Sequence, residues 1–248
     1  MGALDGKKAI VTGASSGIGA ASALALSREG ATVAVGARRI DRLNEFGEGF
    51  IALELDVTDP ESSASFVTSA VHRLEGLDLL VNNAGLAVGR DLFDESREED
   101  EETVLETNVH GLIRMTRLCL PHLAEGGHIV NIGSIAGRQA YERGALYVTS
   151  KFAVRGFTYA LREDLLGRPI RLTTVDPGLV ETNFSRVRFR GDEEAAAKVY
   201  EGVEPLRPED IAECVLFAVT RPPHVNVDEI VVKALAQSSG ARIVRSSG

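Results

Sequence analysis

Short runs of apolar and β-branched residues recur along the whole chain, and longer segments with helical spacing separate them. Nearly continuous hydrophobicity is typical of strands that are covered on both faces, as in a parallel sheet. Seven runs of this kind predict seven strands: KKAIVTG (7–13), ATVAVGA (31–37), FIALELDV (50–57), LDLLVNNAG (77–85), GHIVNIGS (127–134), IRLTTVDPG (170–178) and DEIVVKAL (228–235).

The segments between these runs carry helix signals. Small and apolar residues run from Ile18 to Leu26, and Gly30 supplies a stop signal. Asp59 is suited to cap the next helix, with Pro60 at its first position. Strands that alternate with helices predict an α/β fold, with a doubly wound parallel sheet of about seven strands and helices on both faces. No linker, repeat or low-complexity block divides the chain, so we expect one domain over residues 1–248.

Three stretches break the alternation. The acidic segment 94–102 (DESREEDEE) is expected to be a solvated helix start rather than a cation site. Residues 181–205 form a long insertion, which we expect to be a loop and helix that cover a substrate site. The small, polar residues at 240–248 are expected to form a tail.

Composition and charge exclude several classes of protein. The 44% hydrophobic and 25% charged residues are ordinary for a globular protein, and a net charge of −9 argues against nucleic acid or an acidic carrier protein as partner. Cys119 and Cys214 lie far apart in apolar helical patterns, so we expect them to be buried and free of metal or disulfide. Four histidines show no metal-ligand spacing: His110, His122, His128 and His224. No targeting or membrane-spanning stretch is visible. We expect a reduced, cytoplasmic compartment and no metal.

The first predicted strand runs directly into TGASSGIG, with glycines at positions 13, 17 and 19, and then into a helix. Glycines let a backbone approach a pyrophosphate closely, and the following helix N-terminus offers free N–H groups and a positive dipole end. This placement predicts a dinucleotide site. At the end of the second strand Ala37 is neutral, and Arg38 and Arg39 follow it. Two guanidinium groups suit a 2′-phosphate, which favours NADP(H) over NAD(H) unless the arginines merely begin the next helix and face water.

Tyr147 and Lys151 lie four residues apart in YVTSK, so they share one face of a predicted helix. An isolated pair of this kind is most often a buried tyrosine beside a solvated lysine. With TGASSGIG, NNAG, YVTSK and DPG in this order, however, the whole chain resembles a short-chain dehydrogenase/reductase with a Rossmann fold.

The resemblance implies a set of site residues. The catalytic set would be Asn108, Ser134, Tyr147 and Lys151. The cofactor would be held by Gly13, Ser15, Ser16, Gly17, Ile18, Gly19, Arg38, Arg39, Asp56, Val57, Asn83, Ala84, Gly85, Tyr147, Lys151, Pro177, Gly178, Val180 and Thr182. One departure is Glu101, which stands where many relatives carry tryptophan. Relatives are commonly tetramers, which implies a homotetramer built on the two helices that carry the tyrosine and the asparagine and on the last strand.

Three longer segments, GSIAGRQAY, FSRVRFRGDEEAAAKVY and HVNVDEIVVKAL, resemble the subgroup of NADP-dependent 3-hydroxy acid dehydrogenases. The resemblance implies serine, allo-threonine, 3-hydroxypropionate or related substrates. A carboxylate would need a guanidinium partner, and we expect Arg188 to bind it, with Arg138 and Ser134 also at the substrate and Arg186 and Arg190 as further candidates.

These residue types can perform a hydride transfer that is coupled to a proton. Free tyrosine has a pKa of about 10, and a nearby ammonium favours the phenolate, so Lys151 is expected to lower the pKa of Tyr147. The Ser134 hydroxyl would donate to the substrate oxygen, and Asn108 would connect Lys151 to solvent through water. Two alternatives stay open: a reductase of apolar ketones, aldehydes or steroids, and a dinucleotide-sensing regulator without catalysis.

Overall fold

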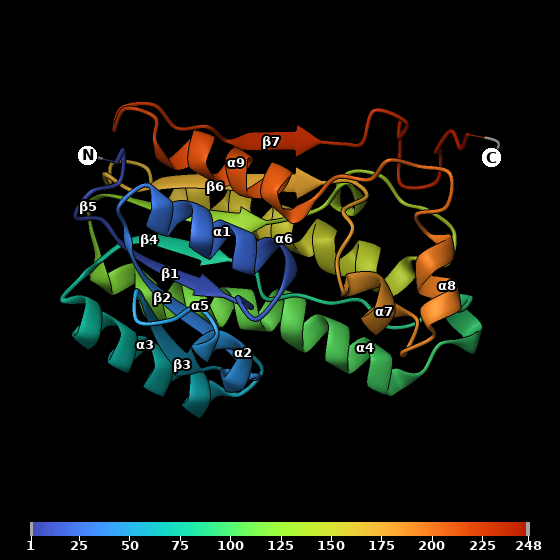
Figure 1. Ribbon diagram of the computed structural model, residues 1–248, viewed down its shortest axis with the longest axis horizontal. Coiled ribbons are helices and arrows are strands. Elements are labelled where there is room, and N and C mark those ends of the chain that lie inside the picture. The colour runs from blue at the N-terminus through green and yellow to red at the C-terminus, as the bar shows by residue number, and fades with distance from the viewer. Residues whose placement is uncertain (1, 247–248) are drawn as a thin grey trace.

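A single seven-stranded sheet forms the centre of the molecule (Figure 1). The computed structural model describes residues 2–246. The strands run in the order β3-β2-β1-β4-β5-β6-β7, and every neighbouring pair is parallel. The prediction of a doubly wound α/β fold is therefore confirmed. The strands are β1 (Lys8–Thr12), β2 (Thr32–Ala37), β3 (Phe50–Glu54), β4 (Leu77–Asn82), β5 (Leu123–Ile132), β6 (Arg171–Pro177) and β7 (Glu229–Val232).

Helices cover both faces of this sheet. The α-helices are α1 (Gly17–Arg28), α2 (Ile40–Asn44), α3 (Pro60–Leu74), α4 (Glu98–Leu105), α5 (Leu112–Cys119), α6 (Ala145–Asp164), α7 (Phe184–Arg188), α8 (Glu193–Lys198) and α9 (Pro208–Val219). A π-helical turn, η2 (Glu106–Gly111), joins α4 to α5, and short 3₁₀ turns occur at η1 (Phe93–Glu95), η3 (Leu120–His122) and η4 (Ile135–Gly137).

The alternation of side chains along the strands divides the core into two layers. Val11 of β1 packs in the same cluster as Leu26 of α1 and Val215 of α9, whereas the adjacent Ile10 packs with Phe66 of α3. Burying one such side chain stabilises the fold by about 1.5–3 kcal/mol. Both faces of the central strands are therefore fixed, which holds the strand ends in place.

The expected helix boundaries at α1 and α3 are confirmed. The Asp59 carboxylate accepts a hydrogen bond from the backbone N–H of Glu61, and Pro60 opens α3. Helix α1 ends at Arg28, and Gly30 follows with φ of +95°. Cys119 is buried as expected, but Cys214 is only half-buried, at the edge of the core cluster against which it packs.

The expected cover segment, residues 181–205, contains α7 and α8 beyond the carboxyl ends of the strands (Figure 1). Arg190, between these helices, pairs with Asp91 and with Asp100 of α4. Within the acidic segment the helix begins only at Glu98, so the expectation of a helix start is correct for its second half, and Asp100 also anchors the cover.

The expected polar tail is not free over its described part, residues 240–246. The Arg245 guanidinium donates to the carbonyl of Val199 (3.1 Å), and Ser246 N–H donates to the carbonyl of Gly202 (2.9 Å). Carbonyl groups at a helix end lack partners within the helix, so a guanidinium binds there readily. Residues 247–248 of the expected tail lie outside the described residues. Over the part of the chain that is described, no helix is both long and apolar enough to cross a bilayer.

Candidate active site

A cavity of about 1100 Å³ opens at the carboxyl ends of the strands. It is lined by residues from the ends of the first six strands, from the cover segment and from the C-terminal segment. Most of the residues expected from the sequence line it: Gly13, Ser15, Ser16, Gly17, Ile18, Arg38, Arg39, Asp56, Val57, Asn83, Ala84, Gly85, Ser134, Tyr147, Lys151, Pro177, Gly178, Val180, Thr182 and Arg188. Gly19, Asn108 and Arg138 do not.

The glycine-rich loop between β1 and α1 fits closely against the end of β4. A Cβ on Gly13, which has φ of +66°, would lie 2.8 Å from Ala84 Cα, and a Cβ on Gly19 would lie 2.4 Å from Asn83 Nδ2. The loop can approach neighbouring groups only because these side chains are absent. It leads directly into the N-terminus of α1, where free N–H groups and the helix dipole favour a phosphate.

Two arginines stand at the end of β2 beside this loop. Arg39 Nη2 donates to Ser15 Oγ (2.9 Å) and to Ser16 Oγ (3.0 Å), so its side chain turns toward the loop although the residue immediately precedes α2. The pKa of Asp56 is lowered: burial opposes this, but hydrogen bonds from Thr58 and the charge of Arg38 outweigh it. The edge of the cavity at β2 is therefore cationic, as a 2′-phosphate requires.

Helix α6 carries Tyr147 and Lys151 on the face that lines the cavity. Lys151 Nζ lies 5.8 Å from the centroid of the Tyr147 ring and donates to the carbonyl of Ile132, the last residue of β5 (2.9 Å). Burial lowers the pKa of Lys151 to about 8, against the opposing charge of Asp176. The lysine is thus fixed and titrates close to neutrality.

The phenol of Tyr147 is less acidic here than the sequence led us to expect. Burial raises its pKa above the ordinary value, while a hydrogen bond from Ser134 and the charge of Arg188 oppose the shift. The expected lowered pKa is not found, because desolvation outweighs the nearby cations. Tyr147 is consequently a protonated phenol in this structure, which suits the donation of a proton to a carbonyl oxygen.

Ser134 stands directly after β5, at the start of η4. Its Oγ accepts a hydrogen bond from Ala136 N–H (3.1 Å), and its own N–H donates to Asp176 Oδ1 (3.2 Å). An accepting hydroxyl keeps its own proton, so Ser134 still has a donor, which the phenol of Tyr147 accepts in this structure. Ser134 and Tyr147 therefore present two hydroxyl groups to the same space.

Asn108 is buried in the π-helical turn η2, behind the cavity wall. Its side chain exchanges hydrogen bonds with both backbone groups of Leu86 (2.8 Å each) and donates to Ser150 Oγ (3.0 Å). A Cβ on Gly85 would lie 3.2 Å from Asn108 Oδ1 and 3.8 Å from Lys151 Nζ, so these two side chains are neighbours. π-Helical turns are frequently found at functional sites.

Arg188 of α7 reaches over the two tyrosines at the cavity. Its guanidinium carbon lies 5.4 Å from the Tyr141 ring centroid and 5.7 Å from that of Tyr147, and Nη2 donates to the Tyr141 hydroxyl (3.0 Å). Arg188 Nε is buried and has no hydrogen-bond partner within residues 2–246. Arg90 also lines the cavity, and burial together with the charge of Arg188 lowers its pKa. The cavity thus holds cationic groups beside Tyr147.

The structure corrects the expectation for Arg138. Its Nε lies 2.6 Å from Asp176 Oδ2 and its Nη2 lies 2.5 Å from Glu229 Oε2, so two carboxylates of the protein occupy it, and it does not line the cavity. Arg186 pairs with Glu193 (2.9 Å) and is exposed, so it also points away from the cavity.

Sequence reasoning missed part of the cavity wall. Tyr141 and Arg90 come from loops, and Gln237 and Arg245 come from the C-terminal segment. Only Tyr141 had a signal, because it closes the GSIAGRQAY segment that carried the subgroup resemblance. Among the described residues no group of three or more histidine, cysteine or acidic side chains could hold a metal ion.

Comparison with known proteins finds a consistent set of similarities. The family model for short chain dehydrogenases matches residues 7–193. An NADP-dependent 3-hydroxy acid dehydrogenase of Schizosaccharomyces pombe is 40% identical over 256 residues, covering 99% of both chains. A protein of the same name from Salmonella typhi is 42% identical over 245 residues, covering 96% of this chain and 99% of its own.

Solved structures agree with these sequence matches. The closed form of a serine dehydrogenase complexed with NADP⁺ superimposes with a TM-score of 0.91 at 38% identity, over 97% of this chain and 100% of that one. Serine dehydrogenase from Escherichia coli gives a TM-score of 0.81 at 35% identity, over 93% of this chain and 99% of its own.

Proposed function

The chain belongs to the short-chain dehydrogenase family, and we propose that it is an NADP(H)-dependent enzyme that interconverts a 3-hydroxy acid and its carbonyl product. The observation that carries the proposal is Arg188, a cation beside Tyr147 whose buried Nε has no partner among the described residues. The names of the most similar relatives support the same substrate class.

The residues at the nucleotide end fit NADP(H). The glycine loop lines the cavity at the N-terminus of α1, where free N–H groups suit a pyrophosphate, and Arg38 and Arg39 offer guanidinium groups for a 2′-phosphate. Arg39 Nη2 already donates to two hydroxyl groups of the loop, so its guanidinium stands beside the proposed phosphate site. When bound, the dinucleotide supplies the hydride acceptor or donor, and the protein supplies orientation and proton transfer.

We assign proton transfer to Tyr147. In reduction its protonated phenol donates to the carbonyl oxygen, while the Ser134 hydroxyl donates a second hydrogen bond that stabilises the charge developing there. In oxidation the phenol must first lose its proton, and the charge of Arg188 favours the phenolate. Lys151 Nζ, 5.8 Å from the ring centroid, is a second cation beside the phenol. Asn108 adjoins Lys151 and is assigned to connect it to solvent through water.

Arg188 would hold the substrate carboxylate. A guanidinium can bind a carboxylate with two parallel hydrogen bonds, and Arg188 offers a buried Nε together with its terminal nitrogens. Stacking over the Tyr141 and Tyr147 rings fixes the guanidinium at the catalytic hydroxyl groups. A 3-hydroxy acid separates its carboxylate from the reacting carbon by one carbon atom, which matches a binding group close to Tyr147.

Apolar side chains of the cover segment also line the cavity, namely Phe184, Val187 and Phe189. They favour a second candidate, a reductase of apolar ketones, aldehydes or steroids. A spectrophotometric panel separates the two: L-serine, allo-threonine and 3-hydroxypropionate with NADP⁺ or NAD⁺, and uncharged ketones and aldehydes with NADPH. Turnover of an acid with NADP⁺ supports the proposal. Consumption of NADPH by uncharged carbonyls, with none of the acids oxidised, would replace it with the second candidate, and no turnover at all would indicate a regulator.

We further propose a homotetramer. Large apolar side chains are exposed on the outer faces of α6, β7 and α9: Phe152, Tyr159, Val231 and Phe217, with exposed fractions between 44% and 51%. Contact with other copies would remove this apolar surface from water. Light scattering on the purified protein is expected to give about four times the 26.5 kDa chain mass, and a monomer would contradict the assembly.

A further inference from the structure

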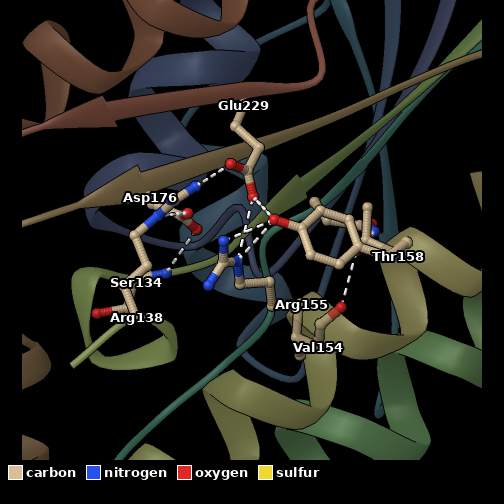
Figure 2. A network of polar contacts seen from close by, with 9 residues as sticks. Ser134, Arg138, Val154, Arg155, Thr158, Asp176 and Glu229 are labelled. Carbon is tan, nitrogen blue, oxygen red and sulfur yellow. Dashed lines mark hydrogen bonds and ion pairs between the residues drawn. The ribbon is translucent and has the colours of Figure 1, made fainter. Parts of the chain in front are cut away.

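A group of charged and polar side chains lies directly behind Ser134 (Figure 2). We call it the Asp176 network; it consists of Asp176, Arg138, Glu229, Arg155 and Tyr159. It joins the ends of β6 and β7 to η4 and α6. None of the proton-transfer steps assigned above uses it, so its presence beside the catalytic residues needs a separate explanation.

Asp176 is the inner end of this network. Only 2% of it is exposed, and its Oδ1 accepts the backbone N–H of Ser134 while its Oδ2 accepts Arg138 Nε. A Cβ on Gly133 would lie 1.9 Å from Asp176 Oδ1, so the chain leaves space for the carboxylate by having glycine there. Burying a carboxylate is costly unless it is paired and hydrogen-bonded. Both oxygens of Asp176 meet that condition.

The outer part of the network holds Arg138 in position. Glu229 stands between Arg138 and Arg155 (Figure 2), and it also accepts the Tyr159 hydroxyl (2.6 Å). Arg155 in turn donates to the same hydroxyl (2.6 and 2.9 Å). The Arg138 guanidinium is therefore held between Asp176 and Glu229. It in turn fixes the Asp176 carboxylate that accepts the backbone N–H of Ser134.

Asp176 also acts on the catalytic residues through its charge. The groups around it are Arg138 from η4, Glu229 from β7 and Lys151 from α6. Its negative charge raises the pKa of Lys151 and that of Tyr147, and Tyr147 is further surrounded by Tyr141, Ser134 and Arg188. Loss of the charge of Asp176 would therefore make the phenol of Tyr147 easier to deprotonate.

We propose that Asp176, clamped by Arg138 and Glu229, is a positioning residue that holds the Ser134 turn against Tyr147. Its carboxylate fixes the backbone N–H of Ser134, and the serine hydroxyl then points into the cavity. A purely structural ion pair at the same place would stabilise the fold and leave the chemistry of Tyr147 unchanged. The two roles differ in what they do to kcat and to the pH dependence of the reaction.

The first test is Asp176→Asn, which keeps the shape of the side chain and removes its charge. Oxidation is followed with NADP⁺ and whichever substrate the wild-type enzyme turns over, so that an error in the proposed substrate class does not affect the outcome. We expect kcat to fall by about tenfold or more, with the KM for NADP⁺ changed by less than about twofold. In oxidation, kcat rises with pH as Tyr147 loses its proton. This rise should occur at a pH lower by about half a unit to one unit in the variant.

Asp78→Asn is a matched control at the opposite end of the sheet. Asp78 also accepts a backbone N–H, that of Lys8 (3.0 Å), and also pairs with a cation, Lys7 (2.9 Å), but it lies far from the cavity wall. Its variant should keep the kcat and the pH profile of the wild-type enzyme. Unchanged kcat and pH profile in Asp176→Asn would overturn the proposal.

The double variant Asp176→Asn/Arg138→Gln removes both buried charges together, while Glu229 keeps Arg155 and Tyr159. Removing both partners of a buried pair is far less destabilising than removing one, so this variant should fold even where the single one does not. A positioning role predicts that its kcat stays low and its pH profile stays shifted, although thermal unfolding and NADPH binding, followed by fluorescence, return toward wild-type values. Recovery of kcat together with stability would show that the pair is only structural.

Discussion

Replacing Arg188 with methionine should separate the recognition of a substrate carboxylate from catalysis. Methionine keeps an apolar stem of similar length against the Tyr141 and Tyr147 rings but has no charge and no donors. Hydrogen bonds to charged groups contribute about 1.5–3 kcal/mol. At about 1.4 kcal/mol for each factor of ten, losing that interaction should lower kcat/KM for a hydroxy acid by about 10- to 100-fold.

Arg188 has a second effect, which all substrates share. Its charge lowers the pKa of Tyr147, so the variant should raise that pKa and move the pH profile of oxidation to higher pH. A substrate without a carboxylate corrects for this shared effect. The assay therefore measures kcat/KM for 3-hydroxypropionate and for the uncharged 1,3-propanediol across pH, in the wild-type enzyme and in the variant.

The expected result is a fall of about 10- to 100-fold in the ratio of the two kcat/KM values. Arg186→Met is the control, since Arg186 lies on the same helix, is exposed and pairs with Glu193 outside the cavity. It should leave the ratio unchanged. An unchanged ratio in Arg188→Met, with both substrates affected equally, would refute a carboxylate-binding role for Arg188.

Three further substitutions test other parts of the structure. Arg39→Ala should weaken NADPH binding by about tenfold and NADH binding much less, as measured by fluorescence titration, whereas the control Arg42→Ala, which breaks only a surface ion pair with Glu45, should change neither. Equal losses for both dinucleotides would argue against a 2′-phosphate site. Burial, with a contribution from Arg171, lowers the pKa of His128 to about 3, so below about pH 6.5 the unfolded chain binds a proton that the folded chain does not. This group should make the free energy of unfolding, measured in urea, fall by about 1.4 kcal/mol per pH unit as the pH drops; His128→Gln should flatten that dependence, and an identical slope would contradict it. Gly133→Ala places a methyl group 1.9 Å from Asp176 Oδ1, so we expect a loss of about 1–3 kcal/mol in the free energy of unfolding together with lower kcat. Wild-type values for both would show that Asp176 can move away from the methyl group without cost.

Much of the fold could be predicted because strands of a parallel sheet are buried on both faces and therefore appear in the sequence as nearly continuous apolar runs. Six of the seven apolar runs contain an observed strand and the seventh overlaps one, and the start of α3 was visible as Asp59 and Pro60. The main discrepancy is β5, which starts at Leu123 rather than near residue 127. Its pairing with β4 contains a register shift at that point, and such irregular pairing depends on the neighbouring strand.

The cavity residues that belong to local sequence motifs could be predicted. Those whose role depends on partners distant in sequence could not. Glycines after a strand indicated the loop at β1, the YVTSK motif indicated Tyr147, and the family resemblance indicated Ser134 at a strand end. Arg138 was misassigned because its partners, Asp176 and Glu229, come from strands that only the folded sheet brings next to it. The direction of the Tyr147 pKa shift was missed for a similar reason. Burial of the phenol depends on how the cover segment packs on it, as Phe184 does, and the sequence does not show this packing.

The C-terminal segment shows the same limit. Its polar residues predicted a tail, yet Arg245 binds carbonyl groups at the end of α8 and lines the cavity. A guanidinium is polar in the sequence whether it faces water or a helix end. Only the position of α8 decides between the two.

We propose that Tyr147 transfers the proton while NADP(H) and a hydroxy acid react in this cavity. The most direct measurement compares the oxidation of 3-hydroxypropionate by NADP⁺ in the wild-type enzyme and in Tyr147→Phe, together with NADPH binding by fluorescence. We expect turnover to fall by at least about a hundredfold in the variant while NADPH binding is unchanged. Turnover that survives in Tyr147→Phe would show that another group transfers the proton.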